Sequence, residues 1–144
     1  MSYRVIPTLR FQKDVKHLQK KYRHIIPDLE ELNNILADNP SCGNAIEGLE
    51  GKVFKIRLAS SDTAKGKSGG FRIIYYLLHT DKTVYLLTIY AKAYRENIDP
   101  AEIKVILKKP GCGSYYIRQR FSFIWIFNAA IQNIAKHPPY MENV

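Results

Sequence analysis

Hydrophobic side chains near the start of the chain change from a strand-like to a helix-like spacing. Residues 2–7 are rich in apolar side chains and end at Pro7. Because proline has no amide hydrogen to donate to a sheet, a short strand is expected there. Apolar side chains then recur three and four residues apart, which places them on one face of an α-helix. Thr8 is the expected N-cap, and the apolar positions are Phe11, Val15, Leu18, Tyr22 and Ile25.

A second amphipathic helix is predicted after a very short connection. Pro27 suits the first position of a helix, which needs no amide hydrogen, and the three acidic residues after it suit the positive end of the helix dipole. Asn39 and Pro40 end the pattern. Since only residues 24–26 separate the two helices, an antiparallel helical hairpin is expected.

The middle of the chain has the period of two that is typical of β-strands. Over residues 52–58, apolar side chains alternate with Lys55 and Arg57, so one side of this strand is expected to face the core and the other to be cationic. Residues 71–78 and 84–90 are β-branched and aromatic runs joined by a short turn. Three consecutive strands predict an antiparallel meander.

A further helix is predicted from Asp99 and Pro100, an N-cap followed by a proline at the first helical position. Beyond Pro110 this pattern is broken, and Phe and Ile then recur with helical spacing. The apolar run there is shorter than the roughly 18 residues that a membrane helix needs, so no membrane span is expected.

These patterns together predict an α+β fold, with a helical hairpin packed on an antiparallel sheet and an extra C-terminal hydrophobic helix. The length of 144 residues suits one ordinary domain. We assign residues 1–109 to this domain and residues 110–144 to an extension of unknown role, for which packing on the domain, self-association and contact with a partner all remain open.

Charge narrows the classes of partner. The formal net charge is +9 and the pI is about 9.6, which favours a polyanion or an acidic protein as partner. The charges are segregated along the chain, with a strongly basic first helix and an acidic second one.

The two cysteines, Cys42 and Cys112, have neither the spacing of a metal site nor that of a secreted disulfide framework. Reduced thiols, no metal and no cofactor are therefore expected. The first residues lack the apolar core of a signal peptide, which predicts a location in the cytoplasm.

The densest cluster of candidate functional residues lies between residues 55 and 72. Two strand-borne cations are followed by a glycine-containing loop and by one more cation on the next strand, and these side chains are expected to converge on a phosphate. The loop lacks the spacing of a P-loop. The residues concerned are Lys55, Arg57, Lys65, Lys67, Ser68 and Arg72.

A second cluster follows the last predicted strand, where aromatic rings alternate with cations: Tyr90, Lys92, Tyr94 and Arg95. Rings that stack on unpaired bases, beside cations that hold phosphates, are typical of single-stranded RNA recognition. The alternative is that Tyr90 packs in the core and the cations are only solvated.

Four blocks resemble the RelE/HigB-type toxins of bacterial toxin–antitoxin modules, over about residues 3–108. They are FQKDVKHLQKKY from Phe11, GLEGKVFKIRLAS from Gly48, GKSGGFRIIYYL from Gly66 and LLTIYAKAYRENI from Leu86. The resemblance implies a fold of the microbial-ribonuclease type, cleavage of mRNA in the ribosomal A site, and inhibition by an acidic antitoxin.

Residue by residue, the resemblance makes Lys55, Arg57 and Arg72 catalytic and places Lys92 where a second arginine is common. The lysine preserves the charge at that position but not the bidentate geometry of a guanidinium. Lys65, Lys67, Ser68, Tyr94 and Arg95 are expected to bind RNA. Ile98 stands where the family has a tyrosine, and Tyr94 is the expected substitute.

The expected reaction is attack of the ribose 2′-hydroxyl on the adjacent phosphorus. Arginines hold charge but do not give up a proton, so Lys55 is the hypothetical general base. His79 is the histidine that competes for this role, and Glu47 and Glu50 are more simply solvated loop residues. Two other functions remain open, a gyrase-targeting toxin of the ParE type without catalysis and a nucleic-acid-binding module.

Overall fold

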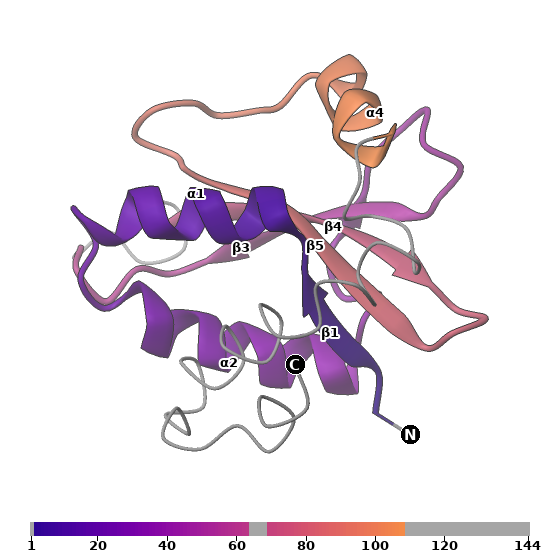
Figure 1. The fold of residues 1–144 in the computed structure, drawn as a ribbon, viewed down its shortest axis with the longest axis horizontal. Coiled ribbons are helices and arrows are strands. Elements are labelled where there is room, and N and C mark those ends of the chain that lie inside the picture. The colour runs from indigo at the N-terminus through magenta and orange to yellow at the C-terminus, as the bar shows by residue number, and fades with distance from the viewer. Residues whose placement is uncertain (1, 64–68, 109–144) are drawn as a thin grey trace, which may run out of the picture.

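A computed structural model describes residues 2–63 and 69–108 (Figure 1). The described helices and strands, in chain order, are β1 (Arg4–Pro7), α1 (Leu9–Gln19), α2 (Ile25–Asp38), β2 (Asn44–Ala45), β3 (Val53–Leu58), β4 (Phe71–Leu78), β5 (Thr83–Ala91) and α4 (Pro100–Lys108). The predicted α+β class is confirmed. The expected C-terminal hydrophobic helix and the extension 110–144 lie outside the described residues.

The strands form one five-stranded sheet in the order β1-β5-β4-β3-β2. The predicted antiparallel meander of β3, β4 and β5 is confirmed. β1 pairs with β5 in parallel, so the complete sheet is mixed. The parallel pairing is feasible because α1 and α2 lie between β1 and the meander, giving the chain the length that a parallel connection requires. The two-residue strand β2 was not predicted because it is too short to show an alternation.

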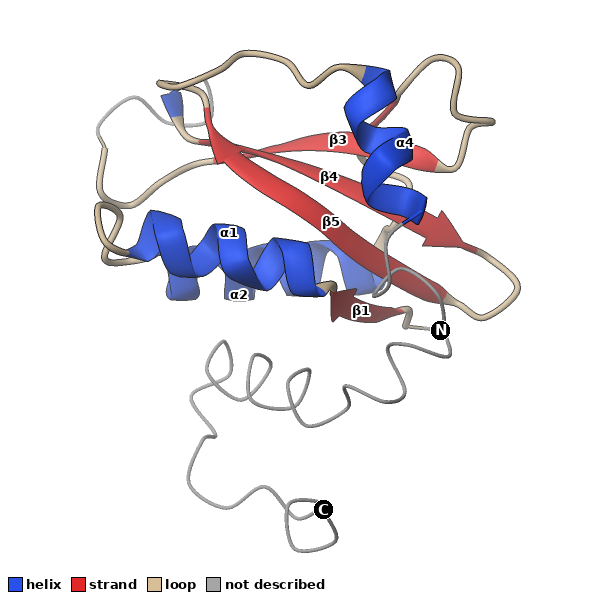
Figure 2. Ribbon diagram, turned by 45° about the horizontal axis from the view of Figure 1, so that its top comes forward, coloured by secondary structure: helices blue, strands red, loops and turns tan. Residues whose placement is uncertain are grey.

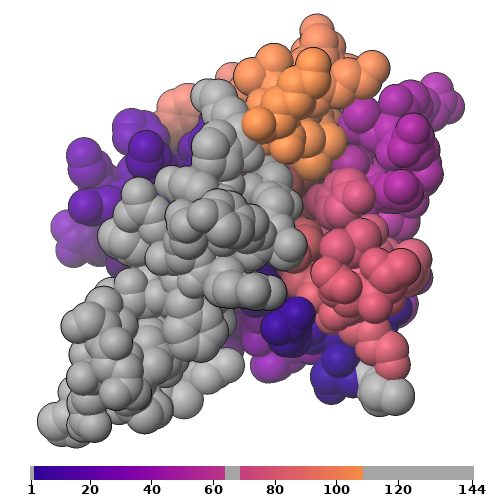
Figure 3. Space-filling model, turned by 45° about the vertical axis from the view of Figure 1, so that its right-hand side comes forward, coloured from indigo at the N-terminus to yellow at the C-terminus, as the bar shows by residue number. Residues whose placement is uncertain are grey.

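The two faces of the sheet carry separate apolar cores. α1 and α2 form the predicted antiparallel hairpin and cover one face (Figure 1). α4 crosses the strands on the other face (Figure 2), where Ile103 and Ile106 pack with Ile74 and Leu87. In the space-filling view, α4, in orange, lies against the magenta segment before β3, whose Leu49 belongs to the same cluster (Figure 3).

The helix boundaries differ from the sequence prediction at one junction. Tyr22 and Ile25 are buried as expected, but α1 ends at Gln19 and Ile25 already belongs to α2. The helical spacing runs on through the connection because it is itself a tight turn, in which the amide of Tyr22 donates to the carbonyl of Leu18 at 2.8 Å. α2 therefore starts two residues before Pro27, which still lies in the first turn, where no intrahelical donor is required.

The helix predicted from Asp99 and Pro100 begins as expected, since Asp99 Oδ1 accepts a hydrogen bond from the amide of Ala101 at 2.9 Å. None of the described helices is long and apolar enough to cross a membrane.

Candidate functional site

Two arginines face each other across the centre of the sheet. Arg57 of β3 is the register partner of Arg72 of β4, and Arg72 in turn is the partner of Tyr90 on β5. All three side chains are on the face that carries α4, because they alternate with residues of the helical-hairpin core. Like charges directly opposite each other in a sheet are destabilising. The pair is thus a natural place for an anion.

Arg72 is the more deeply placed of the two, with 2% of its surface exposed, whereas Arg57 is exposed. Burial, reinforced by the charge of Arg57, lowers the pKa of Arg72, while Glu96 and Tyr90 act in the opposite direction. One Nη1 hydrogen bond to the carbonyl of Phe71, at 3.2 Å, helps to hold the guanidinium.

Lys55 lies on the same face of β3, two residues before Arg57. Its Nζ donates a 2.9 Å hydrogen bond to Oδ1 of Asn97, in the segment between β5 and α4. This contact anchors the end of a flexible side chain next to the arginine pair. Asn97 was not singled out in the sequence, because a hydrogen bond between residues 42 positions apart leaves no local pattern.

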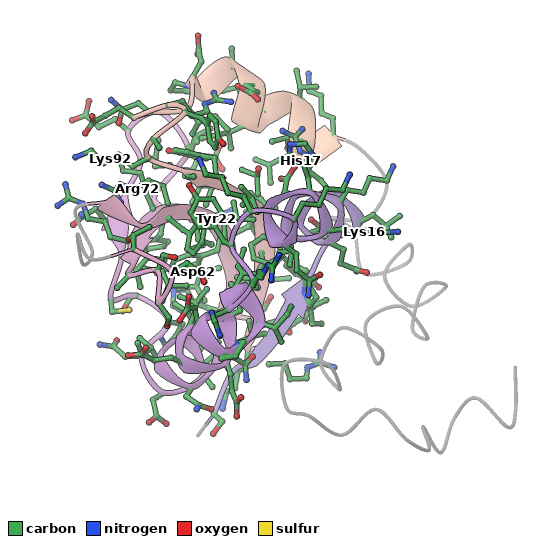
Figure 4. The ribbon with its side chains drawn as sticks, turned by 90° about the vertical axis from the view of Figure 1, so that its left-hand side faces the viewer. Lys16, His17, Tyr22, Asp62, Arg72 and Lys92 are labelled. Carbon is green, nitrogen blue, oxygen red and sulfur yellow. The ribbon has the colours of Figure 1, made fainter. Side chains whose placement is uncertain are left out.

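Lys92 completes what we call the cationic cluster, which consists of Lys55, Arg57, Arg72 and Lys92. The amide of Lys92 donates to the carbonyl of Gly70 at 3.0 Å, which fixes it beside the start of β4. Lys92 and Arg72 lie next to each other at one end of the molecule (Figure 4). The structure therefore brings together all four residues that the sequence assigned to catalysis.

A glycine makes this arrangement of strands feasible. A Cβ on Gly70 would lie 2.1 Å from the carbonyl oxygen of Leu58 and 2.9 Å from the amide nitrogen of Ser60. β4 can therefore begin against the end of β3 only without a side chain there. The expected RNA-binding residues Lys65, Lys67 and Ser68 lie outside the described residues.

Arg95 and Tyr94 are placed differently from the cationic cluster. Arg95 Nη2 forms a 2.8 Å ion pair with Glu102 of α4, and its guanidinium lies 5.2 Å from the centre of the Tyr90 ring. This pairing raises the pKa of Arg95 and lowers that of Glu102. Tyr94 is 66% exposed, and its hydroxyl accepts a 3.0 Å hydrogen bond from Lys21 Nζ.

The histidine considered as an alternative base does not join the site. His79 follows the opposite end of β4, about 23 Å of strand from Arg72 at the usual rise per residue, and its Nδ1 is 3.0 Å from the hydroxyl of Tyr3. Glu47 and Glu50 are exposed, as expected for solvated residues. Among the described residues, no group of three or more His, Cys, Asp or Glu side chains is arranged to hold a metal ion.

A comparison with protein-family models matches residues 10–120 to the RelE toxin of the RelE/RelB toxin–antitoxin system. Solved structures similar to this chain include the free RelE toxin of E. coli in a mutant form, at 18% identity and a TM-score of 0.48, covering 67% of this chain and 90% of that one. The toxin–antitoxin complex RelBE2 of Mycobacterium tuberculosis matches at 19% identity and a TM-score of 0.49, covering 65% and 94%.

Proposed function

Because the chain belongs to the RelE toxin family, and is thus a toxin of a toxin–antitoxin system, we propose that it acts as an endoribonuclease on translated mRNA. The substrate would be mRNA in the ribosome. The product would be cleaved mRNA, and translation of that mRNA would stop. The observation that carries this proposal is the Arg57–Arg72 pair, two opposed cations flanked by Lys55 and Lys92.

The proposed reaction is an intramolecular transesterification. The ribose 2′-oxygen forms a bond to the adjacent phosphorus as the bond to the 5′-oxygen breaks. This leaves a 2′,3′-cyclic phosphate, and the departing 5′-oxygen takes a proton from water to become a 5′-hydroxyl end. Negative charge grows on the phosphoryl oxygens, and fixed cations stabilise it most effectively where water is excluded. Arg72, which is buried and hydrogen-bonded to the carbonyl of Phe71, is suited to this role with Arg57.

Proton transfer is assigned to Lys55 and charge neutralisation to Lys92. Lys55 would accept the 2′ proton, for which its contact with Asn97 supplies orientation. Lys92 carries one positive charge on a single nitrogen, unlike an arginine guanidinium. It would therefore neutralise the phosphate without forming two parallel hydrogen bonds to it.

The proposed protein partner is an acidic antitoxin. A chain of net charge +9 whose catalytic cations face one side attracts an acidic segment by the same field that attracts RNA. Binding of such a segment over the cationic cluster would block it.

The test is inducible expression in bacteria with mRNA 5′ ends mapped. We expect new cuts within translated messages for the intact chain, and at least about a hundredfold fewer for the double variant Arg57→Ala/Arg72→Ala, since removing one stabilising donor alone costs about that much. Arg4→Gln, which removes an arginine next to Thr83 at the other end of the sheet, is the matched control. Growth arrest with intact messages would contradict the proposal and favour a toxin of the ParE type.

A further inference from the structure

A cleft of about 430 Å³ lies between α1, with the turn that follows it, and the end of β5. One wall is formed by α1, including Asp14 and His17, and by residues 20–22 of the turn after it, and the other by residues 88–91, 94 and 95. The volume falls in the range of small-molecule sites and is far too small for a nucleic-acid duplex.

At the rim of the cleft, the ring of Tyr94 lies beside Lys20 and Lys21, which are more than 70 residues away in the sequence. Lys21 Nζ lies 3.0 Å from the Tyr94 hydroxyl and 4.9 Å from the centre of its ring, and Lys20 lines the cleft beside it. The ring is 66% exposed although it is held at its hydroxyl end. A fixed, exposed ring with ammonium groups beside it matches the needs of an unpaired base and its phosphate.

Tyr90 supplies a second and independent indication. It lines the cleft and is 8% exposed, and its hydroxyl is buried with no hydrogen-bond partner among the described residues. Leaving a buried hydroxyl unsatisfied costs free energy, so such a group calls for a ligand or functional explanation. Burial also raises the pKa of Tyr90, which keeps the hydroxyl protonated as a donor.

The negative charge in the cleft is already compensated. Asp14 accepts hydrogen bonds from Arg10 at 3.1 Å and from the Thr88 hydroxyl at 2.6 Å. Arg95 is paired with Glu102, so Lys20 and Lys21 are the cations that make the field in the cleft positive. Because Tyr90 is also the register partner of Arg72, this lining residue of the cleft lies on the strand next to a member of the cationic cluster.

We propose that this cleft binds one unpaired nucleotide of the RNA next to the one held at the cationic cluster. Its base stacks on Tyr94, its phosphate contacts Lys20 and Lys21, and the Tyr90 hydroxyl is the hydrogen-bonding group at the buried end. The inference rests on the proposed function for the identity of the strand. It adds a second site on the far side of Tyr90 from Arg57, built from α1, the turn after it and the end of β5.

The test is the affinity of the full chain for a fluorescein-labelled single-stranded RNA hexamer whose riboses are all 2′-O-methylated, so that it cannot be cleaved. Fluorescence anisotropy is measured for the wild type and for Tyr94→Ala, Tyr94→Phe, Tyr90→Phe and Lys20→Ala/Lys21→Ala. Lys13→Ala/Lys16→Ala is the matched control, because it removes the same charge from α1, just before the turn that holds Lys20 and Lys21, at positions that do not line the cleft. Circular dichroism verifies that each variant is folded.

We expect Tyr94→Ala to weaken binding about tenfold, the usual effect of losing one stacked base, while Tyr94→Phe keeps the ring and most of the affinity. Lys20→Ala/Lys21→Ala should weaken binding more than its control does. Tyr90→Phe, which removes a single oxygen, should lower affinity and change the ranking of hexamers that differ in base.

Cleavage of unmodified messages, measured with the same preparations in a translating extract, separates the two proposals. If the cleft variants and their control bind equally while Arg57→Ala/Arg72→Ala binds less, the cleft is not an RNA site and the proposed ribonuclease stands. If the cleft variants lose affinity but the wild type never cleaves messages, the proposal that the cleft binds RNA is supported and the proposal that the chain is a ribonuclease is contradicted. A wild-type chain that does not bind the hexamer overturns the cleft.

Discussion

At the scale of single residues, two side chains that are unfavourable for the stability of the folded protein lie close to each other. Arg72 is buried opposite a like charge, and Tyr90 is buried with a hydroxyl that no described residue satisfies. In the functions proposed above, a phosphate beside Arg72 would offset the repulsion by Arg57, and a base beside Tyr90 would satisfy its hydroxyl. Residues that lower stability at one place are typical of functional sites.

The arginine pair leads to a prediction about anions. Arg57→Gln should raise the free energy of unfolding by up to about 1 kcal/mol, because it removes the like charge opposite Arg72. Inorganic phosphate should raise the melting temperature of the wild type more than that of Arg57→Gln. Thermal unfolding with and without phosphate at constant ionic strength measures both effects. A variant that is less stable than the wild type without phosphate would show that favourable contacts of Arg57 outweigh its repulsion of Arg72.

Tyr75 gives a prediction about alkaline pH. Its hydroxyl donates to the carbonyl of Pro40 at 2.6 Å and accepts from the amide of Gly43 at 3.1 Å. Burial raises the pKa of Tyr75 to about 12 from 10.0. Because the folded-state pKa is the higher one, the stabilisation is complete below pH 10 and is lost as the pH rises toward 12.

Tyr75→Phe should therefore be less stable at neutral pH but should lose less stability between pH 10 and 12, by on the order of 1–2 kcal/mol. Urea unfolding at a series of pH values compares the two slopes. Parallel slopes would mean that other groups account for the alkaline loss.

At the scale of elements, the site depends on how β4 starts and on how α1 starts. Gly70, directly before β4, lies against the end of β3, and Thr8, the N-cap of α1, lies against β5. The first contact sets Arg72 opposite Arg57. The second sets the face of α1 that lines the cleft.

Gly70→Ala should destabilise the protein by about 3 kcal/mol or more, because the nearest obstacle to the new Cβ is backbone. The control is Gly51→Ala, where φ is +69° and nothing lies within 4 Å, so only the conformational penalty of about 1 kcal/mol applies. Chemical denaturation of both variants gives the comparison. Equal losses would mean that the strands separate at this point without cost.

Thr8→Ala should cost about 1–2 kcal/mol, because the hydroxyl serves two partners at once. It accepts from the amide of Phe11 at 3.3 Å and donates to the carbonyl of Leu86 at 2.8 Å, and Thr8 is buried. Thr8→Ser retains the hydroxyl and should recover most of the stability. A serine variant as weak as the alanine one would assign the loss to the methyl group.

At the scale of the whole molecule, charged side chains join the two layers on either side of the sheet. Arg10 of α1 contacts Asp14 at 3.1 Å and Glu102 of α4 at 3.7 Å, and Glu102 contacts Arg95 at 2.8 Å. Exposed ion pairs are individually weak, but this set connects Arg10 and Arg95, from the two walls of the cleft, through Glu102 of α4.

Arg95 lowers the pKa of Glu102, so the contribution of this carboxylate to stability is present above its ordinary pKa of 4.5 and is lost as the pH falls below it. Glu102→Gln should therefore flatten the acid loss of stability and should speed amide exchange in α4 at neutral pH. Hydrogen exchange read by mass spectrometry, compared with exchange in α2 as an internal reference, tests this. Unchanged exchange in α4 would show that apolar contacts alone hold the helix.

The sequence by itself determined the helical hairpin, the antiparallel meander and the cationic side of β3, because each follows from spacing within a few residues. It also marked Lys55, Arg57, Arg72 and Lys92, since charge on an alternating strand is a local signal. Only the tertiary structure decided that β1 lies parallel to β5, that Arg95 pairs with Glu102 and that Lys21 meets Tyr94. Such contacts join residues that are far apart in the sequence or depend on side-chain placement in the folded chain, so the spacing of neighbouring residues does not reveal them.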